Sequence, residues 1–228
     1  MKNLVVIPAR GGSKGIPGKN IYPLCGKPLL SYTLDMLIDI PLDINIVVST
    51  DSIEIASVAT SYKDVIVINR PSNISGDMAS TESALCHAID TMKRDYHKEF
   101  DAIITLQPTS PFRHQSTLVR FVEYFENMPE EYDALLTLSE TRTDYWIKEY
   151  GHFRRMFPNA PRRRQEREPI YYENSAIYMT KTSSLVETGS VLGHKVDGFI
   201  ISDEEGLDIN EMNDIYIAES YMKHRDQI

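Results

Sequence analysis

Short apolar runs rich in valine and isoleucine alternate with helix-like patterns along the first half of this 228-residue chain. Strand-like runs stand at 3–8, 44–50, 64–69, 101–106 and 133–139, and helix-like patterns stand at 28–40, 51–62, 80–96 and 116–128. This alternation predicts an α/β fold built on a doubly wound, mostly parallel sheet. Because ligands of such sheets bind at the carboxyl ends of the strands, we expect the functional residues in the segments that directly follow these runs.

The alternation breaks between 141 and 171, where aromatic residues, prolines and arginines follow no steady period. We interpret this segment as an arm that protrudes from a single domain spanning 1–228. Beyond the arm, strands are expected at 174–180 and 197–202, and helices at 181–188 and 210–225.

The charge balance limits the partners of the chain. With 24 Lys+Arg against 33 Asp+Glu, the net charge is −9, which leaves no broad basic face for nucleic acid or an anionic membrane. The apolar run at 4–7 is too short for a signal peptide or a membrane span. Cys25 and Cys86 lack the spacing of a metal site, so we expect reduced thiols in a cytoplasmic protein.

A glycine-rich segment, "IPARGGSKGIPGKN", follows the first predicted strand and spans 7–20. It combines four glycines with the cations Arg10, Lys14 and Lys19, although the whole chain is acidic. A glycine-rich turn after a strand surrounds an anion with backbone N–H groups. We therefore predict a polyphosphate site here.

Two common nucleotide fingerprints do not fit this loop. The P-loop pattern needs a glycine where Ser13 stands and a serine or threonine where Asn20 stands. The dinucleotide pattern also needs a glycine in place of Ser13, and no acidic residue follows at the usual distance. A dinucleotide-dependent oxidoreductase is thus the weaker alternative.

The segment "IPARGGSKGIPGKNI" resembles the signature of the CMP-sialic acid synthetase (acylneuraminate cytidylyltransferase) family. The motifs "STD", "RP" followed by "DMAST", "LQPTSPFR", "RRQ", "ENSAIY" and "LDIN" follow in family order and cover nearly the whole chain. The resemblance implies a Rossmann-like fold of the nucleotide-diphospho-sugar transferase type, with an arm that serves a homodimer. It implies that the anomeric hydroxyl of a nine-carbon, sialic-acid-like sugar acid attacks the α-phosphate of CTP and releases pyrophosphate.

The resemblance also assigns roles to individual residues. The expected nucleotide contacts are Ala9, Arg10, Gly11, Ser13, Lys14, Lys19, Asn20, Arg70, Ala79 and Thr81. The expected sugar contacts are Gln107, Ser110, Arg164, Asn174 and Tyr178, and the expected catalytic residues are Arg10, Lys19 and Asp208. The family usually has glycine where this chain has Ser175. The sugar acid stays open among N-acetylneuraminic, legionaminic and pseudaminic types and a shorter ulosonic acid.

The arginine-rich arm carries two alternatives. Six arginines between Arg154 and Arg167 suit an RNA backbone, but Pro158, Pro161 and two glutamates interrupt them. Arginine is also the natural fork for the carboxylate of a sugar acid, and Arg164 matches the arginine of the family motif. We expect the arm to pack across a twofold dimer near the partner's sugar site.

The expected metal is Mg²⁺, and its position departs from the family pattern. The family motif "DID" is "DIN" in this chain, at Asp208-Ile209-Asn210. Alternate residues of an extended segment point to one side, so Asp208 and Asn210 are the expected ligands. Asn210 offers an amide oxygen without charge.

Overall fold

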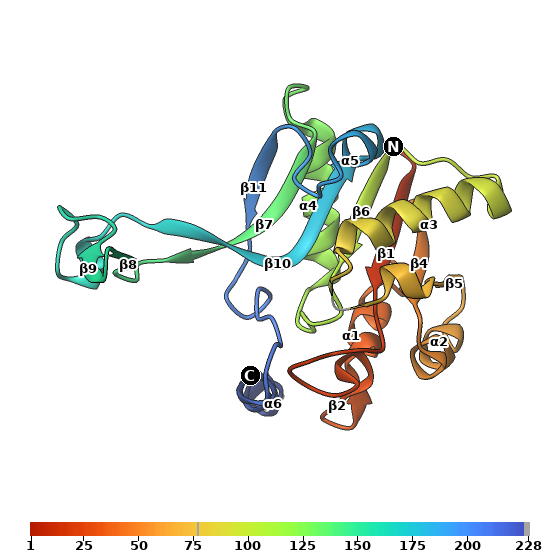
Figure 1. The fold of residues 1–228 in the computed structure, drawn as a ribbon, viewed down its shortest axis with the longest axis horizontal. Coiled ribbons are helices and arrows are strands. Elements are labelled where there is room, and N and C mark those ends of the chain that lie inside the picture. The colour runs from red at the N-terminus through yellow and green to blue at the C-terminus, as the bar shows by residue number, and fades with distance from the viewer. Residues whose placement is uncertain (77, 226–228) are drawn as a thin grey trace.

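A seven-stranded sheet forms the centre of the computed structural model, which describes residues 1–76 and 78–225 (Figure 1). The strand order is β11-β7-β10-β6-β1-β4-β5. The strand β10 runs antiparallel to both of its neighbours, and the other pairs in this sheet are parallel. The strands are β1 (Asn3–Pro8), β4 (Ile44–Thr50), β5 (Val65–Asn69), β6 (Ala102–Leu106), β7 (Ala134–Thr141), β10 (Ile170–Lys181) and β11 (Val196–Ile200). The predicted mostly parallel α/β sheet is confirmed.

The connections between these strands carry the predicted helices. They are α1 (Leu29–Met36), α2 (Ile53–Thr60), α3 (Thr81–Tyr96), α4 (Gln115–Asn127), α5 (Thr182–Thr188) and α6 (Met212–Arg225), with short 3-10 turns η1 (Lys19–Ile21), η2 (Ser72–Ile74) and η3 (Arg164–Glu166). Ser52 and Ser80 cap α2 and α3, because each hydroxyl accepts a backbone N–H in the first turn. In the part of the chain that the structure describes, no helix is both long and apolar enough to cross a membrane.

Helices cover both faces of the sheet, as a doubly wound fold requires. Residues Val5 and Ile7 of β1 join the core under α1, α2 and α4, whereas Leu4 and Val6 join the core under α3 and α5. This alternation follows from the two-residue period of a strand that is buried on both faces.

A third apolar cluster lies beyond the sheet and holds the loops of the site together. It joins Ile16 of the glycine-rich loop, Phe112 of the β6–α4 loop and Ile209 of the "LDIN" segment, all about 1% exposed or less. The helix α6 closes this cluster with Ile215. A small hairpin, β2 (Pro23–Leu24) and β3 (Lys27–Pro28), adds Leu24. Segments from both ends of the chain therefore share one small core next to the strand ends.

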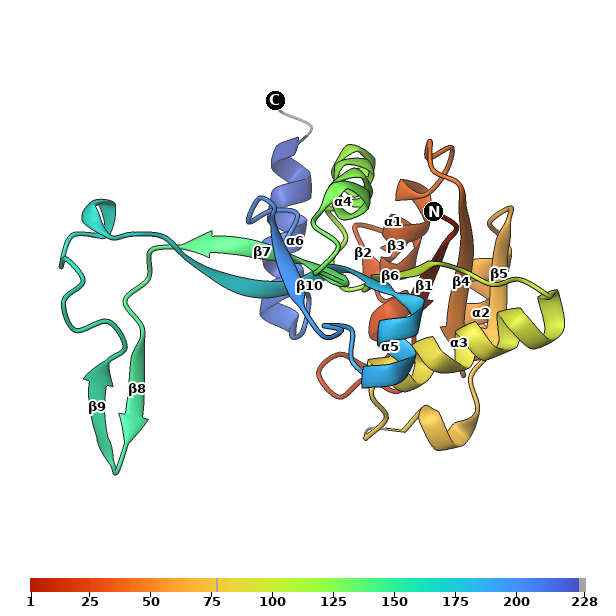
Figure 2. The ribbon, with the colours of Figure 1, turned by 90° about the horizontal axis from the view of Figure 1, so that it is seen from above.

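The arm is more regular than the sequence predicted. The strands β7 and β10 continue out of the sheet as a paired ribbon, and β8 (Trp146–Glu149) and β9 (His152–Arg155) form a hairpin at its end (Figures 1 and 2). Tyr150 and Gly151 both have positive φ, which suits a two-residue hairpin turn. The sequence over 141–171 shows no steady period, so the prediction of an arm did not include this hairpin.

Two further predicted boundaries are wrong. The helix expected over 28–40 ends at Met36, because Asp39 takes a positive φ and Pro41 disfavours a helical residue before it. The strand expected over 174–180 begins at Ile170, because Tyr171 and Tyr172 continue the pairing with β7.

Candidate active site

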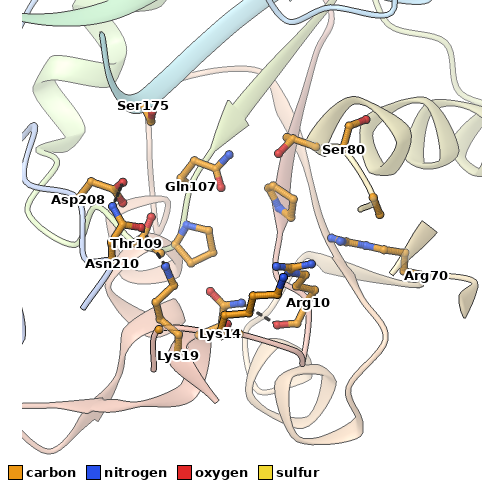
Figure 3. Close-up of a pocket in the computed structure, with 17 residues that line it drawn as sticks. Arg10, Lys14, Lys19, Arg70, Ser80, Gln107, Thr109, Ser175, Asp208 and Asn210 are labelled. Carbon is orange, nitrogen blue, oxygen red and sulfur yellow. Dashed lines mark hydrogen bonds between the residues drawn. The ribbon is translucent and has the colours of Figure 1, made fainter. Parts of the chain in front are cut away.

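A cavity of about 480 Å³ opens at the carboxyl ends of β1 and β6, where the sequence predicted the site. Its lining includes most of the predicted residues: Arg10, Ser13, Lys14, Lys19, Asn20, Arg70, Ala79, Thr81, Gln107, Asp208 and Asn210. Arg70 and Ser80 lie at one end, and Asp208, Asn210 and Ser175 lie at the other (Figure 3). Lys14 and Arg10 lie between these ends (Figure 3). The cavity is therefore elongated, with cations along its middle.

Arg70 is a buried cation at the end of β5. Its side chain is 6% exposed, and its guanidinium donates to Ser49 Oγ at 3.1 Å and to the Ser49 carbonyl at 2.7 Å. Burial lowers the pKa of Arg70, an effect that Asp51 opposes and Arg10 reinforces. These hydrogen bonds go to neutral groups, so an anionic or strongly polar ligand in the cavity would offset the cost of burying this charge.

Glycine is required where the first loop approaches the "LDIN" segment. A Cβ on Gly15 would lie 2.2 Å from the carbonyl oxygen of Asn210, and Gly18 has a φ of 62° just before η1. Any side chain at Gly15 would therefore push the loop away from Asp208. Asn20 is buried, and its amide donates to the carbonyl of Arg10 at 2.9 Å. This bond joins the two ends of the glycine-rich loop and stabilises its conformation.

At the Asp208 end of the cavity, hydrogen bonds link three side chains in a row. Lys19 Nζ donates to the carbonyl of Ile209 at 2.9 Å and to Asn210 Oδ1 at 3.3 Å. The amide of Asn210 donates in turn to Asp208 Oδ2 at 2.7 Å. Burial lowers the pKa of Lys19, while Asp208 raises it and Arg10 lowers it further.

Asp208 has an unused acceptor. Its Oδ1 is buried and makes no hydrogen bond with any described residue, although a buried carboxylate oxygen without a partner is costly. The described residues contain no group of three or more His, Cys, Asp or Glu side chains suited to a metal. Mg²⁺ needs only one or two carboxylates from a protein, so the unpartnered oxygen of Asp208, with the amide of Asn210 beside it, would suit this ion.

Several predicted residues lie outside the cavity. Asn174 Oδ1 accepts from Thr137 Oγ1 at 2.6 Å and Asn174 Nδ2 donates to Ser139 Oγ at 3.0 Å, so this amide is occupied inside the sheet. The hydroxyl of Tyr178 donates to Glu173, and burial followed by this bond raises its pKa. The cavity lining also lacks Ala9, Gly11, Ser110 and Arg164.

The positions of these outlying residues differ in kind. Ala9 and Ser110 are buried behind the wall of the cavity, and Gly11 donates its backbone N–H to Asp51 at 2.8 Å. Arg164 lies in η3 on the arm, where its side chain is exposed. The structure of one chain does not bring Arg164 into its own cavity.

Sequence reasoning missed three polar residues that line the cavity. Ser80 stands between Ala79 and Thr81, and it faces the same end as Arg70 (Figure 3). Thr109 lies in "LQPTSPFR", and Ser175 directly follows Asn174. All three lie inside motifs that carry the family resemblance, "DMAST", "LQPTSPFR" and "ENSAIY", and this was the signal available.

The fold and this cavity define an α/β enzyme that accommodates an anionic nucleotide at the strand ends of a doubly wound sheet. The chain belongs to the cytidylyltransferase family, whose family model, described as "Cytidylyltransferase", matches residues 4–195. It is thus a nucleotidyltransferase, and the oxidoreductase alternative finds no support.

Curated relatives span most of the chain. The chain is 30% identical to CMP-N,N'-diacetyllegionaminic acid synthase of Legionella pneumophila, over 98% of this chain and 97% of the relative. It is 28% identical to a pseudaminic acid cytidylyltransferase of Campylobacter jejuni, over 98% and 97%. It is 27% identical to N-acylneuraminate cytidylyltransferase of Escherichia coli O18:K1:H7 over 95% of this chain, but spans only 51% of that relative's length.

Solved structures share the fold at low identity. A CMP:2-keto-3-deoxy-manno-octonic acid synthetase complexed with CTP aligns with a TM-score of 0.68 at 15% identity, over 99% of this chain and 100% of that one. A 4-diphosphocytidyl-2C-methyl-D-erythritol synthase from Anaerococcus prevotii aligns with a TM-score of 0.69 at 12% identity, over 97% and 96%. At such identities these likenesses establish the architecture alone.

Proposed function

We propose that this chain transfers CMP from CTP to the anomeric hydroxyl of a nine-carbon, sialic-acid-like sugar acid and releases pyrophosphate. The observation that carries the proposal is the order of groups along the cavity. Arg70 and Ser80 stand at one end, cations stand in the middle, and the unused oxygen of Asp208 stands at the other end. A nucleoside, a triphosphate and an acceptor sugar require groups in this same order.

The cations do most of the chemical work in this proposal. Arg10, Lys14 and Lys19 bind the triphosphate oxygens and neutralise the charge that moves onto the leaving pyrophosphate. Arg70 and the small Ala79 hold the cytidine end. Gln107, which follows β6 in the cavity wall, orients the sugar acid so that its anomeric oxygen lies in line with the α-phosphorus.

Mg²⁺ is part of this proposal, with Asp208 and Asn210 as the residues that would hold it. A magnesium ion held there would supply positive charge that offsets the charge of the triphosphate. Lys19 competes for the same amide oxygen of Asn210 at 3.3 Å. Asp208 therefore provides the principal carboxylate, and Asn210 orients it through the 2.7 Å bond from its amide.

A homodimer completes the proposal. The arm exposes Trp146, Phe153, Phe157, Tyr171 and Tyr172, each more than 40% accessible in the single chain. Exposed aromatic side chains in this number are typical of protein interfaces. We propose that a partner subunit covers this surface, and that Arg164 of each arm reaches the partner's sugar acid. Because both Cys25 and Cys86 are free thiols, we propose a cytoplasmic location.

The test is pyrophosphate release from CTP in the presence of one sugar acid at a time. The panel contains N-acetylneuraminic, legionaminic and pseudaminic acids and a shorter ulosonic acid. The expected result is release with at least one nine-carbon acid, dependent on Mg²⁺ and specific for CTP over UTP. If pyrophosphate is released only with the shorter ulosonic acid, that acid is the substrate instead of a nine-carbon acid. No release with any acid would refute the proposal.

A further inference from the structure

A bulge in β10 forms the wall of the cavity next to Asp208. Glu173 pairs with Leu138 and Tyr178 pairs with Leu136, so four residues of β10 stand opposite the single residue Thr137. Bulges next to a binding site redirect side chains that a regular strand would point elsewhere. Of the four residues, Ser175 lines the cavity.

Ser175 has a backbone conformation that serine rarely adopts. Its φ is +60°, in the left-handed region where a Cβ is disfavoured. Such strain persists only where the surroundings determine the backbone, and it concentrates at functional sites. Serine here therefore calls for an explanation, since glycine would adopt the same turn without strain.

The residues on both sides of Ser175 are fixed by buried hydrogen bonds. Asn174 is 4% exposed, and its amide oxygen accepts from Thr137 Oγ1 at 2.6 Å and from the N–H of Ala176 at 3.2 Å. The carbonyl of Ala176 accepts from the guanidinium of Arg113 at 2.7 Å. The turn cannot relax without breaking these bonds, so the direction of the Ser175 side chain is set before any ligand binds.

The same Arg113 also connects the bulge of β10 to Gln107, at the end of the cavity that holds Asp208 and Ser175, which we call the acceptor end. Its Nη1 also donates to the carbonyl of Gln107 at 2.7 Å, and Gln107 lines the cavity. On the far side, Gly206 packs against Asn174 so closely that a Cβ would lie 2.8 Å from Nδ2. Ser175 is therefore held in a fixed position relative to both Gln107 and the loop that carries Asp208.

From this geometry we infer that Ser175 is a specificity-determining residue for the sugar acid, an inference that rests on the proposed function. Its hydroxyl shares a hydrogen bond with the Tyr178 hydroxyl and keeps at least one further acceptor site, so it matches a hydroxyl or the N–H of an acylamino substituent of the acid on the Asp208 side of the cavity. It lies at the opposite end from Arg70 (Figure 3) and does not read the nucleotide. A site built to hydrogen-bond such a group discriminates against acids that lack it.

The experiment compares Ser175→Ala and Ser175→Gly with wild type across the panel of sugar acids. Alanine removes the hydroxyl together with its hydrogen bond to Tyr178, and KM for the preferred acid should rise about 3- to 10-fold while KM for CTP stays within about twofold. The advantage of the preferred acid over the others should shrink by the same factor. Ser175→Gly should lose the same selectivity yet melt at a higher temperature than Ser175→Ala, because glycine tolerates the positive φ.

One control variant and two contradicting results complete the test. Ser57→Ala on the exposed face of α2 is the matched control and should change nothing. If Ser175→Ala keeps the wild-type KM and ranking of acids, Ser175 is only a strained turn residue and the inference is wrong. If wild type consumes none of the acids, the proposed function fails, and this inference fails with it.

Discussion

Lys19 and Asn210, from opposite ends of the chain, meet at the floor of the cavity, where Lys19 Nζ donates to Asn210 Oδ1 at 3.3 Å. The contact depends on Gly15, because a Cβ there would lie 2.2 Å from the carbonyl oxygen of Asn210. It also holds the ammonium near Asp208, which opposes the fall in the pKa of Lys19 that burial causes. The charge on Lys19 is thus set by a balance between burial and Arg10, which lower its pKa, and Asp208 and Asp214, which raise it.

The first prediction concerns the pH dependence of CTP use. The pKa of Lys19 is lowered in the fold, so the free enzyme loses this positive charge as pH rises through a value below 10.5. We expect kcat/KM for CTP to fall on the alkaline side in that range, because this parameter reports groups of the free enzyme. Lys19→Arg should move the fall to higher pH. An unchanged alkaline limb in Lys19→Arg would assign it to another group.

The second prediction concerns the metal. Asp208→Asn removes the one carboxylate of the pair, and we expect kcat to fall at least 100-fold with the melting temperature nearly unchanged. Asn210→Asp adds a charge beside Asp208 and should lower the Mg²⁺ concentration needed for half-maximal rate, without a matching gain in kcat. A magnesium titration of the three proteins at saturating CTP and sugar acid measures both effects.

Glu211 provides the control for this titration. It adjoins Asn210 but does not line the cavity, so Glu211→Gln should leave the magnesium dependence as in wild type. A normal magnesium curve and a normal maximum rate in Asp208→Asn would place the metal at other residues.

The sequence predicted the fold well where local pattern and tertiary packing agree. The strands β1, β4 and β6 are buried on both faces, and such strands are continuous apolar runs that composition alone reveals. The β8–β9 hairpin was missed because its turn uses Tyr150 and Gly151 rather than the usual Asn-Gly. The early start of β10 was missed because it depends on pairing with β7, which is not local in sequence.

The candidate site likewise contains residues that local sequence predicts and residues whose position depends on tertiary pairing. The place of the glycine-rich loop in the cavity lining was predictable, because this loop directly follows the carboxyl end of the buried strand β1. Asn174 was expected to contact sugar, but Thr137 and Ser139 of β7 occupy its amide. Their proximity follows from the antiparallel register of β10, which no local motif encodes. The left-handed turn at Ser175 was hidden for the same reason.

The third prediction concerns Arg113, a fully buried cation. Its guanidinium donates to the carbonyls of Gln107 and Ala176 and to Thr33 Oγ1, and burial lowers its pKa to about 9 despite the opposing fields of Asp208 and Glu205. Arg113→Met removes this donor from all three acceptors, although the Gln107 carbonyl keeps the bond from the N–H of Ser110 at 3.3 Å. We expect a loss of about 3 kcal/mol in the free energy of unfolding, measured by urea denaturation.

A second readout separates stability from positioning in this variant. At a temperature where Arg113→Met remains folded, KM for the sugar acid should rise more than KM for CTP, because both carbonyls belong to the acceptor end of the cavity. Arg94→Met is the matched control, since Arg94 is exposed and pairs with its neighbour Asp95, and it should change stability by less than about 0.5 kcal/mol. Equal effects of the two substitutions would remove Arg113 from the support of the site.

The last prediction concerns the arm and its arginines. Arg155 donates to Asp144 at 2.9 Å and the two side chains are only about 15% exposed, so this pair orders the arm. Arg164 is exposed and available to a partner subunit. We expect Arg164→Ala to raise KM for the sugar acid about 10-fold or more and leave KM for CTP nearly unchanged. Arg163→Ala, at an equally exposed neighbour paired with Glu166, should leave both unchanged.

Mixed dimers test whether Arg164 acts across subunits. At a sugar-acid concentration well below the wild-type KM, Arg164→Ala and Asp208→Asn are each expected to be poorly active alone. If the arm of one protomer serves the cavity of the other, a mixed dimer contains one cavity with both Asp208 and a partner's Arg164, so mixing should recover up to about a quarter of the wild-type rate when subunits exchange at random. If Arg164 serves the cavity of its own chain, mixing recovers no activity, because every cavity then lacks either Arg164 or Asp208. A chain that stays monomeric at assay concentration and is fully active would also refute the cross-subunit role.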